Sequence, residues 1–568
     1  MAKSHFSKRC AKITLWTSVT ILLAALIILI LFPTIYKKQL KHDTTLVKGS
    51  LMTKIWEDIP LPIHERLYFF NITNGDDFVN RGAPLNVTQV GPYTYKSSWV
   101  KKDPEWHSNG TVSYREVRTY QFVPEKSVGS QDDTVNTLNG PMIIAANIAK
   151  TYNIWERILL SIGMGVFKET IITSKSIRQL VYDGYKDEII KYAPIIKQDL
   201  PFKDGVFSWL YGKNATDDGL FTVFTGEEDS SQTGLINNWN GEETLSYWKG
   251  DSCNMVNGTS IEVGPPLSND DAAYTFFQTI FCRSLTFDYV KDVTHHDVLS
   301  RRFQPSYKVF ANGSENPENY CYDLTPGRPS GILDVSPCQF GAPVFISFPH
   351  FHMADPSYLK SIVGLNPNAE DHDSHLDVEY VTGISVDISI KFQINIEVSR
   401  VNGITQFDKV TEGIFPILWA DLDLAIDEDL ANFLQKSLKN PKIITYSVLG
   451  VIIGLCAIAI IVSIIILRSS KEEDEELIIV RDDDKSLASS ITTKNHKVYG
   501  TSENTKNVQF ANPPSDVYSE EQEGLINNAV DTSTEARFSG TESSNARAAP
   551  SSNDAAVLHV DQDRPSYM

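Results

Sequence analysis

The chain has 568 residues, 42% of them hydrophobic, and a formal net charge of −20 at pH 7. This acidic balance disfavours nucleic acid as a partner, because a polyanion is bound by a basic surface. The sequence contains no G-x-S-x-G, H-E-x-x-H or G-x-x-x-x-G-K-[ST] motif. We therefore expect neither the hydrolase, metalloprotease and nucleotide-binding chemistry that these motifs mark nor a cofactor or bound metal, and we expect no enzyme.

The first long apolar run covers residues 13–32 and contains no charged side chain. A cleaved signal peptide also follows basic residues, but its apolar segment is shorter and small residues mark the cleavage site. No A-x-A sequence follows this run. We predict an uncleaved transmembrane helix, with a cleaved signal as the alternative, and a short cytosolic N-terminus at residues 1–12.

A second apolar run covers residues 443–467, again without a charge. As a helix it would be roughly 37 Å long at 1.5 Å per residue, enough to cross a hydrocarbon core of ~30 Å. Core helices of soluble proteins are seldom apolar on every face over such a length. We therefore predict a second transmembrane helix, which places both termini on the same side of the membrane.

The segment between the two spans, residues 33–442, carries the N-x-[ST] sequons. None occurs in the C-terminal tail, residues 468–568. Glycosylation takes place in the secretory lumen, so we expect 33–442 to be lumenal or extracellular and both termini to be cytosolic. The predicted glycosylation sites are Asn71, Asn86, Asn109, Asn214, Asn257 and Asn312.

Four of the six cysteines, Cys253, Cys282, Cys321 and Cys338, also lie between the spans. An even number in an oxidising compartment predicts two disulfides, with three possible connectivities. Metal ligation is disfavoured because no C-x-x-C pair is present. Cys10 precedes the first span and is either S-acylated or an unmodified cytosolic thiol.

The segment 33–442 mixes strand and helix patterns. Residues 67–72 and 111–122 read as strands, and apolar residues recur at helical intervals over 142–185. We expect two or three helices there, with either a buried seam or an exposed apolar patch that contacts a ligand. Strict alternation over 386–398 predicts a strand with one wet face and one face that packs on a core or lines an apolar cavity.

Histidine and acidic residues cluster in three places. Glu370, Asp371, His372, Asp373, His375 and Asp377 lie close together in the sequence, and a solvated acidic turn is favoured over a divalent-ion site. We expect His350 and His352 to be structural. The pair His295-His296 can titrate with compartment acidity but is expected to be exposed.

The tail, residues 468–568, is polar and acidic without sustained periodicity, so we predict that it is disordered. It contains two sequences of the acidic-dileucine form [DE]-x-x-x-L-[LI], which endocytic adaptors read on extended chains. The first is formed by Glu473, Leu477 and Ile478. The second is formed by Glu521, Leu525 and Ile526.

Several motifs between residues 10 and 467 resemble the class B scavenger receptor family, whose members include the fatty acid translocase (thrombospondin receptor) and the lysosomal integral membrane protein. The motifs are Val90-Gly-Pro-Tyr-Thr-Tyr95, Leu245-Ser-Tyr-Trp248, Asn257-Gly-Thr259, Phe281-Cys-Arg-Ser284, Asn319-Tyr-Cys321, Gly364-Leu-Asn-Pro367 and Pro416-Ile-Leu-Trp419. The tail lies outside this resemblance.

The resemblance implies an α+β fold: an irregular β-rich barrel crossed by an apolar tunnel, an apical helical bundle at 142–185, and two membrane anchors. It also implies the disulfides Cys253–Cys321 and Cys282–Cys338, and it places Lys168 where a basic residue of the bundle can meet anionic ligands. Some members have a third disulfide that begins two residues after Asn-Tyr-Cys. Here that position is Asp323, so the third bridge is missing.

Two functions follow as hypotheses. The first is a receptor that binds lipids, fatty acids, lipoproteins or lipid-bearing debris and mediates their uptake or transfer to the membrane. The second is an endolysosomal sorting receptor for a protein partner, directed by the dileucine-type motifs. We expect residence in the plasma membrane, the endosome–lysosome membrane or both, with a homo-oligomer left open.

Overall fold

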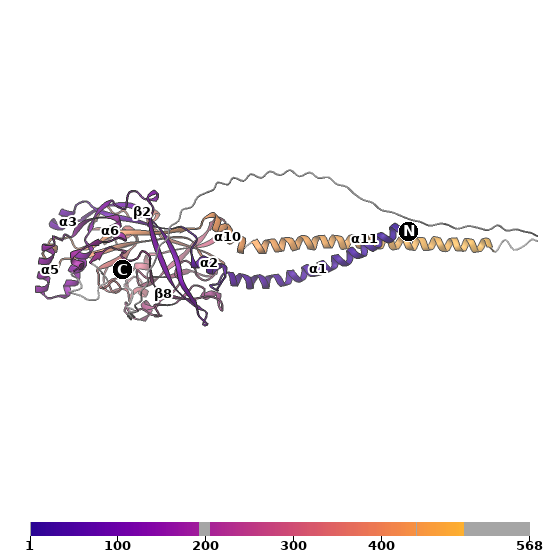
Figure 1. Cartoon of the computed structure of the whole chain (residues 1–568), viewed down its shortest axis with the longest axis horizontal. Coiled ribbons are helices and arrows are strands. Elements are labelled where there is room, and N and C mark those ends of the chain that lie inside the picture. The colour runs from indigo at the N-terminus through magenta and orange to yellow at the C-terminus, as the bar shows by residue number, and fades with distance from the viewer. Residues whose placement is uncertain (1, 192–204, 439, 493–568) are drawn as a thin grey trace, which may run out of the picture. The chain divides into compact units, whose positions relative to one another are not determined.

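The computed structural model describes residues 2–191, 205–438 and 440–492 (Figure 1). Two long helices contain the predicted spans: α1 (Ala2–Asp43) and α11 (Asn440–Thr492). Their segments Ser7–Asp43 and Asn440–Glu476 are long and apolar enough to cross a membrane. A two-pass membrane protein fits both segments, as the sequence predicts.

Helix α11 continues beyond the apolar run to Thr492. The prediction of a disordered tail is therefore wrong for residues 468–492. This part is rich in Glu, Lys, Leu and Ala, which favour helix, and Lys471 pairs with Glu475 one turn later at 3.6 Å. The first dileucine-type motif lies on this helix, whereas Glu521, Leu525 and Ile526 lie outside the described residues.

The rest of the fold is dominated by one large sheet of 14 strands. Its hydrogen-bonded path runs β10 (Ala273–Gln278), β11 (Arg283–His295), β12 (Val298–Gln304), β16 (His375–Glu379), β17 (Ser385–Val398), β18 (Gly413–Ala425), β1 (Ile63–Ile72), β2 (Leu85–Trp106), β3 (Thr111–Phe122), β8 (Thr216–Phe224) and β9 (Ile236–Trp239). Three short strands join its sides: β13 (Leu333–Asp334), β14 (Val344–Ser347) and β15 (Ile362–Val363). All these pairs are antiparallel except β15 with β2.

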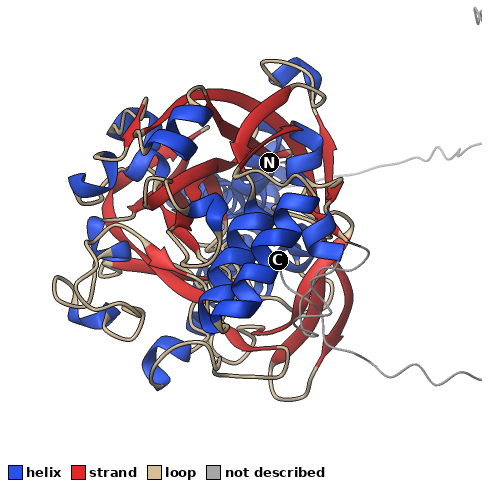
Figure 2. Ribbon diagram, turned by 90° about the vertical axis from the view of Figure 1, so that its left-hand side faces the viewer, coloured by secondary structure: helices blue, strands red, loops and turns tan. Residues whose placement is uncertain are grey.

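The sheet curves strongly in projection (Figure 2) but is not a closed barrel, because its path ends at β10 and β9. This corrects the barrel expectation. The Gly258–Thr259 segment lies between the two edges and bonds to both. The Ile236 amide donates to the Gly258 carbonyl at 2.8 Å, and the Phe277 amide donates to the Thr259 carbonyl at 2.9 Å. We call this segment the seam.

Strands β1 and β18 are the first and last of the sheet in the chain, and they pair in its middle. His64 lies opposite Asp423, and Phe69 lies opposite Leu418. The start of β1 therefore meets the end of β18, so the chain segments that lead to both membrane helices leave the sheet at one end.

Strand β17 alternates as predicted, and Val386, Ile388 and Ile396 are buried. The prediction that its opposite face is wet is wrong in the middle of the strand, where Gln393 and Asn395 are fully buried. They are covered by β14 and the following loop: Asn395 Nδ2 donates to the Phe345 carbonyl at 3.2 Å and to Ser347 Oγ at 3.0 Å. Because the covering segment supplies the polar partners, burial of these amides is compatible with stability.

The region 142–185 forms helices, as predicted. They are α4 (Gly140–Ile148), α5 (Ile154–Val166) and α6 (Ile177–Val181), with strand β5 (Ile172–Ser176) paired to β4 (Thr134–Leu138) between them. The remaining short elements are α2 (Leu51–Glu57), α3 (Gly75–Arg81), α8 (Asp251–Asn254), α9 (Ala369–His372), α10 (Glu428–Leu438) and the strand pair β6 (Tyr185–Lys186) and β7 (Val206–Phe207).

Two disulfides tie the region around β10 and β11 to the later segment 321–338. Cys253 is bonded to Cys321, with Cα atoms 6.1 Å apart, and Cys282 to Cys338, with Cα atoms 6.4 Å apart. This is the pairing that the family resemblance implies. Cys10 is exposed and unbridged, and Cys456 lies in the second membrane helix.

Replacing Cys282 and Cys338 together by alanine should destabilise the sheet edge. The bridge closes a loop of 56 residues, and removing it should cost about 2–4 kcal/mol, because the unfolded chain gains freedom. A lower melting temperature of the purified protein, measured by tryptophan fluorescence, checks this. Cys10→Ala is the control and should leave the melting temperature unchanged; an equal effect of the two changes would contradict the prediction.

Candidate functional site

Helix α5 presents a continuous stripe of exposed apolar side chains, here called the α5 patch: Trp155, Leu159, Ile162 and Val166. Their spacing of three or four residues places them on one face of the helix. Trp155 is 74% exposed and Val166 is 70% exposed. The region 142–185 shows both expected features: α4 and α6 bury their apolar residues, whereas α5 exposes an apolar stripe. Exposed apolar patches of this kind mark interaction surfaces.

The opposite face of α5 holds the helix in place by polar and apolar contacts. Ser161 Oγ donates to Gln406 Oε1 at 2.8 Å, and Gln406 Nε2 returns a bond to the Ser161 carbonyl at 2.8 Å. At the N-terminus, Asn153 and Glu156 form a reciprocal capping box. On the same side Met164 is 1% exposed and Leu160 packs against the core, so mixed polar and apolar contacts anchor the helix and leave the α5 patch for solvent or a partner.

Lys168 directly follows the α5 patch. It is exposed and has a left-handed backbone (φ 56°), and its amide donates to the Gly165 carbonyl at 3.2 Å. A cation at the C-terminus of a helix is favoured by the helix dipole. Its predicted role toward anionic ligands stays a prediction, but its place beside an apolar surface suits an amphiphilic ligand.

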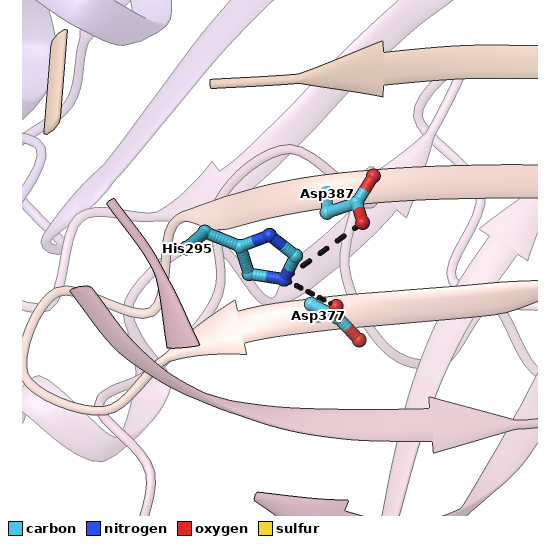
Figure 3. A group of neighbouring side chains, drawn as sticks. All are labelled: His295, Asp377 and Asp387. Carbon is cyan, nitrogen blue, oxygen red and sulfur yellow. Dashed lines mark hydrogen bonds and ion pairs between the residues drawn. The ribbon is translucent and has the colours of Figure 1, made fainter. Parts of the chain in front are cut away.

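A second candidate site is a charged cluster on the sheet formed by His295, Asp377 and Asp387, from β11, β16 and β17 (Figure 3). Asp377 is fully buried, and His295 Nε2 donates to its Oδ2 at 2.6 Å. The same nitrogen lies 3.8 Å from Asp387 Oδ2. His375 adds a second imidazole, with Nε2 3.1 Å from Asp387 Oδ2.

Arg302 of β12 completes this cluster. Its Nε donates to Asp377 Oδ1 at 2.7 Å and its Nη2 donates to Asp377 Oδ2 at 2.6 Å, while Nη2 lies 3.6 Å from Asp387 Oδ2. Such a bidentate pair is the strong form of a charged hydrogen bond. The guanidinium thus already supplies a cation to both carboxylates. The geometry is suited to binding a proton on an imidazole rather than a divalent ion.

The hydrogen bonds within this cluster shift the pKa values of His295 and Asp377 in opposite directions. The hydrogen bond to Asp377 raises the pKa of His295, against the opposing effect of burial. For Asp377, burial acts to raise the pKa, but the bonds from Arg302 and His295 outweigh it and lower the pKa below its ordinary value of 3.8. His295⁺ and Asp377⁻ therefore coexist over a mildly acidic range.

These positions correct two expectations. His295 is not simply exposed, because its ring is bonded to a buried carboxylate. The segment 370–377 is not a solvated turn throughout, since His372 and Asp377 are buried. The pairing was hidden in the sequence because His295 and Asp377 are 82 positions apart and belong to strands that are not neighbours in the sheet.

His350 is structural, as predicted. Its ring is buried and stacked on His372 with centroids 4.4 Å apart, and its Nε2 donates to Gln89 Oε1 at 2.6 Å. Burial lowers the pKa of both His350 and His372 to about 4, so both are neutral at neutral pH. His352 lies at the surface side of this group, with Nε2 2.8 Å from Asp373 Oδ1.

A third polar group, which the sequence analysis missed, is buried between β2 and β3. Lys101 is fully buried, with Nζ 2.5 Å from Glu116 Oε2 and 2.9 Å from Glu262 Oε1. Burial raises the pKa of Glu262 to about 7. A Lys or Glu within a strand pattern is ordinarily read as solvent-facing, so only the three-dimensional pairing reveals this group.

The predicted glycosylation sites have different surroundings. Asn86, Asn109, Asn214 and Asn257 are exposed, whereas Asn71 and Asn312 are partly buried. The Asn312 Nδ2 atom, which would carry the sugar, donates to the Arg328 carbonyl at 3.0 Å. Glycosylation stays a prediction for all six.

Replacing His295 by glutamine should remove stability at acidic pH more than at alkaline pH. Because the folded-state pKa of His295 is raised above 6.5, its contribution is complete below about pH 6.5 and is lost as the pH rises through the raised pKa. The bond should contribute about 1–2 kcal/mol when charged. Melting temperatures of the parent and variant at pH 5.5 and pH 8 check this.

The exposed neighbour His296, changed to asparagine, is the matched control, because asparagine tolerates its left-handed backbone (φ 46°). A difference between His295→Gln and the parent that is the same at both pH values would contradict the assignment. So would an equal pH dependence in the control.

Comparison with known proteins places the chain among membrane receptors. A family model described as the CD36 family matches residues 16–467. Scavenger receptor class B member 1 of Sus scrofa is 33% identical over 438 residues, which cover 76% of this chain and 84% of that protein. Lysosome membrane protein 2 of Homo sapiens is 31% identical over 446 residues, which cover 77% and 91% respectively.

Proposed function

This chain belongs to the CD36 family of class B scavenger receptors, and from that premise we propose that it binds lipids, lipoproteins or lipid-bearing debris and mediates their uptake or transfer to the membrane. The family is one of receptors and not of known enzymes, in agreement with the missing hydrolase and nucleotide motifs. The α5 patch is the observation that carries the proposal.

The α5 patch and Lys168 together match the chemistry of a lipid-bearing particle. Such a particle offers apolar surface beside anionic headgroups. Fully burying one large apolar side chain contributes about 1.5–3 kcal/mol. Four adjacent exposed side chains can therefore supply useful affinity, even after the entropic cost of association.

A second observation supports passage of lipid along the sheet. Ile390, Leu422, Glu65, Tyr95 and Phe122 lie opposite one another across five neighbouring strands, so they share one face. Leu422, Glu65 and Phe122 are only partly buried there. Apart from Glu65, whose Oε2 accepts a hydrogen bond from Tyr182 Oη at 2.5 Å, the row is apolar or aromatic, and its partial access suits the lining of a lipid tunnel. The tunnel itself stays part of the proposal.

Replacing Leu159 by serine should weaken binding of anionic lipid vesicles by roughly tenfold, because about 1.4 kcal/mol of apolar burial is lost. The fold should be unaffected, since Leu159 is exposed. Co-sedimentation of the purified protein with vesicles of phosphatidylserine and phosphatidylcholine measures the effect.

The control is Leu299→Ser, on β12 and outside the α5 patch. Leu299 is 47% exposed, so it matches Leu159 in chemistry but not in place. If the two variants lose affinity equally, or neither loses any, the α5 patch is not the lipid-binding surface.

Transfer of lipid is tested with a photoactivatable fatty acid applied to the full-length protein. Labelled peptides should come from β1, β17 and β18, where Leu422 and its opposite residues lie. Leu422→Arg should reduce this labelling by roughly tenfold, because an arginine opposite Glu65 pairs with that carboxylate and fills the row with charged groups. Labels confined to the membrane helices would count against a tunnel along this face.

The alternative is an endolysosomal sorting receptor for a protein partner, suggested by the tail motifs and by relatives named lysosome membrane protein 2. Adaptors bind dileucine motifs in extended chain, whereas Leu477 and Ile478 belong to α11. Leu525 and Ile526 are therefore the first residues to change.

Leu525→Ala with Ile526→Ala should raise the fraction of the protein at the cell surface, because adaptors would no longer bind this motif. Surface biotinylation measures this fraction, and an unchanged fraction would remove the support for a sorting receptor.

A further inference from the structure

A groove of about 660 Å³ lies beside the seam, within the range of roughly 300–1,000 Å³ typical of small-molecule sites. Its walls come from three places: the loop around the Cys253–Cys321 disulfide, the loop at residues 265–267, and strands β10 and β11. Side chains of mixed character line it, among them Met255, Pro266, Tyr322, Thr275, Ser284 and Thr286.

We propose that this groove holds the inner sugars of the oligosaccharide on Asn257, and so is a binding site for the protein's own N-linked glycan. The inference rests on the predicted glycosylation of Asn257 and is independent of lipid binding. Asn257 is exposed and itself forms part of the groove lining. A sugar on its Nδ2 atom therefore begins at the groove.

The attachment point is held firmly against the groove wall. The backbone N–H of Asn257 donates to Ser284 Oγ at 3.0 Å, and Ser284 Oγ donates to the backbone carbonyl of Asn257 at 2.7 Å. The Asn257 side chain makes no hydrogen bond to the described residues, in contrast to Asn312, whose Nδ2 is engaged. The backbone of Asn257 is thus fixed, while its side-chain Nδ2 atom, to which the sugar attaches, makes no hydrogen bond to the described residues.

The lining also fits the chemistry of a pyranose. A sugar ring has apolar C–H faces and a rim of hydroxyl groups. Met255, Pro266 and Tyr322 offer apolar surface. The Thr275 and Thr286 hydroxyls lie 2.9 Å apart and share one hydrogen bond, which leaves one O–H of this pair to donate and lone pairs to accept from a sugar. A glycan tethered at the rim needs little further affinity to occupy such a groove, because tethering raises its effective concentration.

The last two residues of the sequon, Gly258 and Thr259, form the seam. Thr259 is 1% exposed, and its hydroxyl donates to Tyr274 Oη at 3.2 Å. The Thr259 amide donates to the Thr275 carbonyl at 3.1 Å. A glycan lying in the groove would cover the seam, which bonds to both edge strands of the sheet, β9 and β10. Proteins commonly protect such edge strands from pairing with other molecules.

The test is site-specific glycopeptide mass spectrometry of the full-length protein from mammalian cells. A glycan held in the groove is shielded from processing enzymes, so Asn257 should retain oligomannose, while the exposed Asn109 should carry complex glycans. In the native protein, peptide N-glycosidase should release the Asn257 glycan at least about tenfold more slowly than the Asn109 glycan, and equally fast after denaturation.

Thr286→Arg fills the groove from β11 and should shift the Asn257 glycan toward complex forms. Thr294→Arg, on the same strand but outside the groove, is the matched control and should not. An unoccupied Asn257, equal processing at Asn257 and Asn109, or equal native release rates would each overturn the proposal. The release-rate comparison uses the unaltered protein, so it decides the matter even if Thr286→Arg fails to fold.

Discussion

The pairing of β1 with β18 is the constraint on which the rest of the structure depends. It joins the two ends of the domain between the membrane helices, so that residues 63–72 and 413–425 form adjacent strands despite more than 340 positions of separation. Since His64 lies opposite Asp423, both connections to the membrane leave from the same end. The sheet then extends outward on each side of this pair to its edge strands, β10 and β9, and both of these bond to the seam.

Different contacts cover the central strands and helix α5. The central pair buries apolar residues on both faces, since the consecutive residues Phe69 and Phe70 are each 1% exposed. On β17 the buried amides of Gln393 and Asn395 are bonded by the loop of His350 and by β14. Helix α5 is held by the hydrogen bonds between its Ser161 and Gln406 and by burial of Met164 on the same face. This face of α5 buries both polar and apolar side chains, and the apolar stripe on the other side is left exposed.

Much of the fold could be predicted from the sequence, because the relevant signals are local. Uncharged runs of 20 and 25 residues identify the two membrane helices, and period-two alternation identifies β17. The burial of Gln393 and Asn395 could not be predicted, since it depends on a segment about 50 positions earlier in the chain. Helix beyond Leu467 was missed because its charged residues resemble those of disordered tails, although they also favour helix.

For the candidate sites too, local sequence patterns reveal some features and not others. The exposure of the α5 patch was one of two alternatives, and local periodicity could not choose between them. Sheet topology pairs His295 with Asp377, and a loop before β10 brings Glu262 to Lys101 of β2. Each of these residues alone looks like an ordinary surface group. Electrostatic partners across distant strands are thus the part of the site that a single sequence conceals.

Native mass spectrometry of the full-length protein, released from detergent micelles, tests the central claim most directly. A lipid receptor with an apolar interior should retain a bound lipid or fatty acid of defined mass on each chain, and Leu422→Arg should remove it. A chain that is free of lipid under conditions that preserve its fold, and that instead retains a protein partner, would contradict the account.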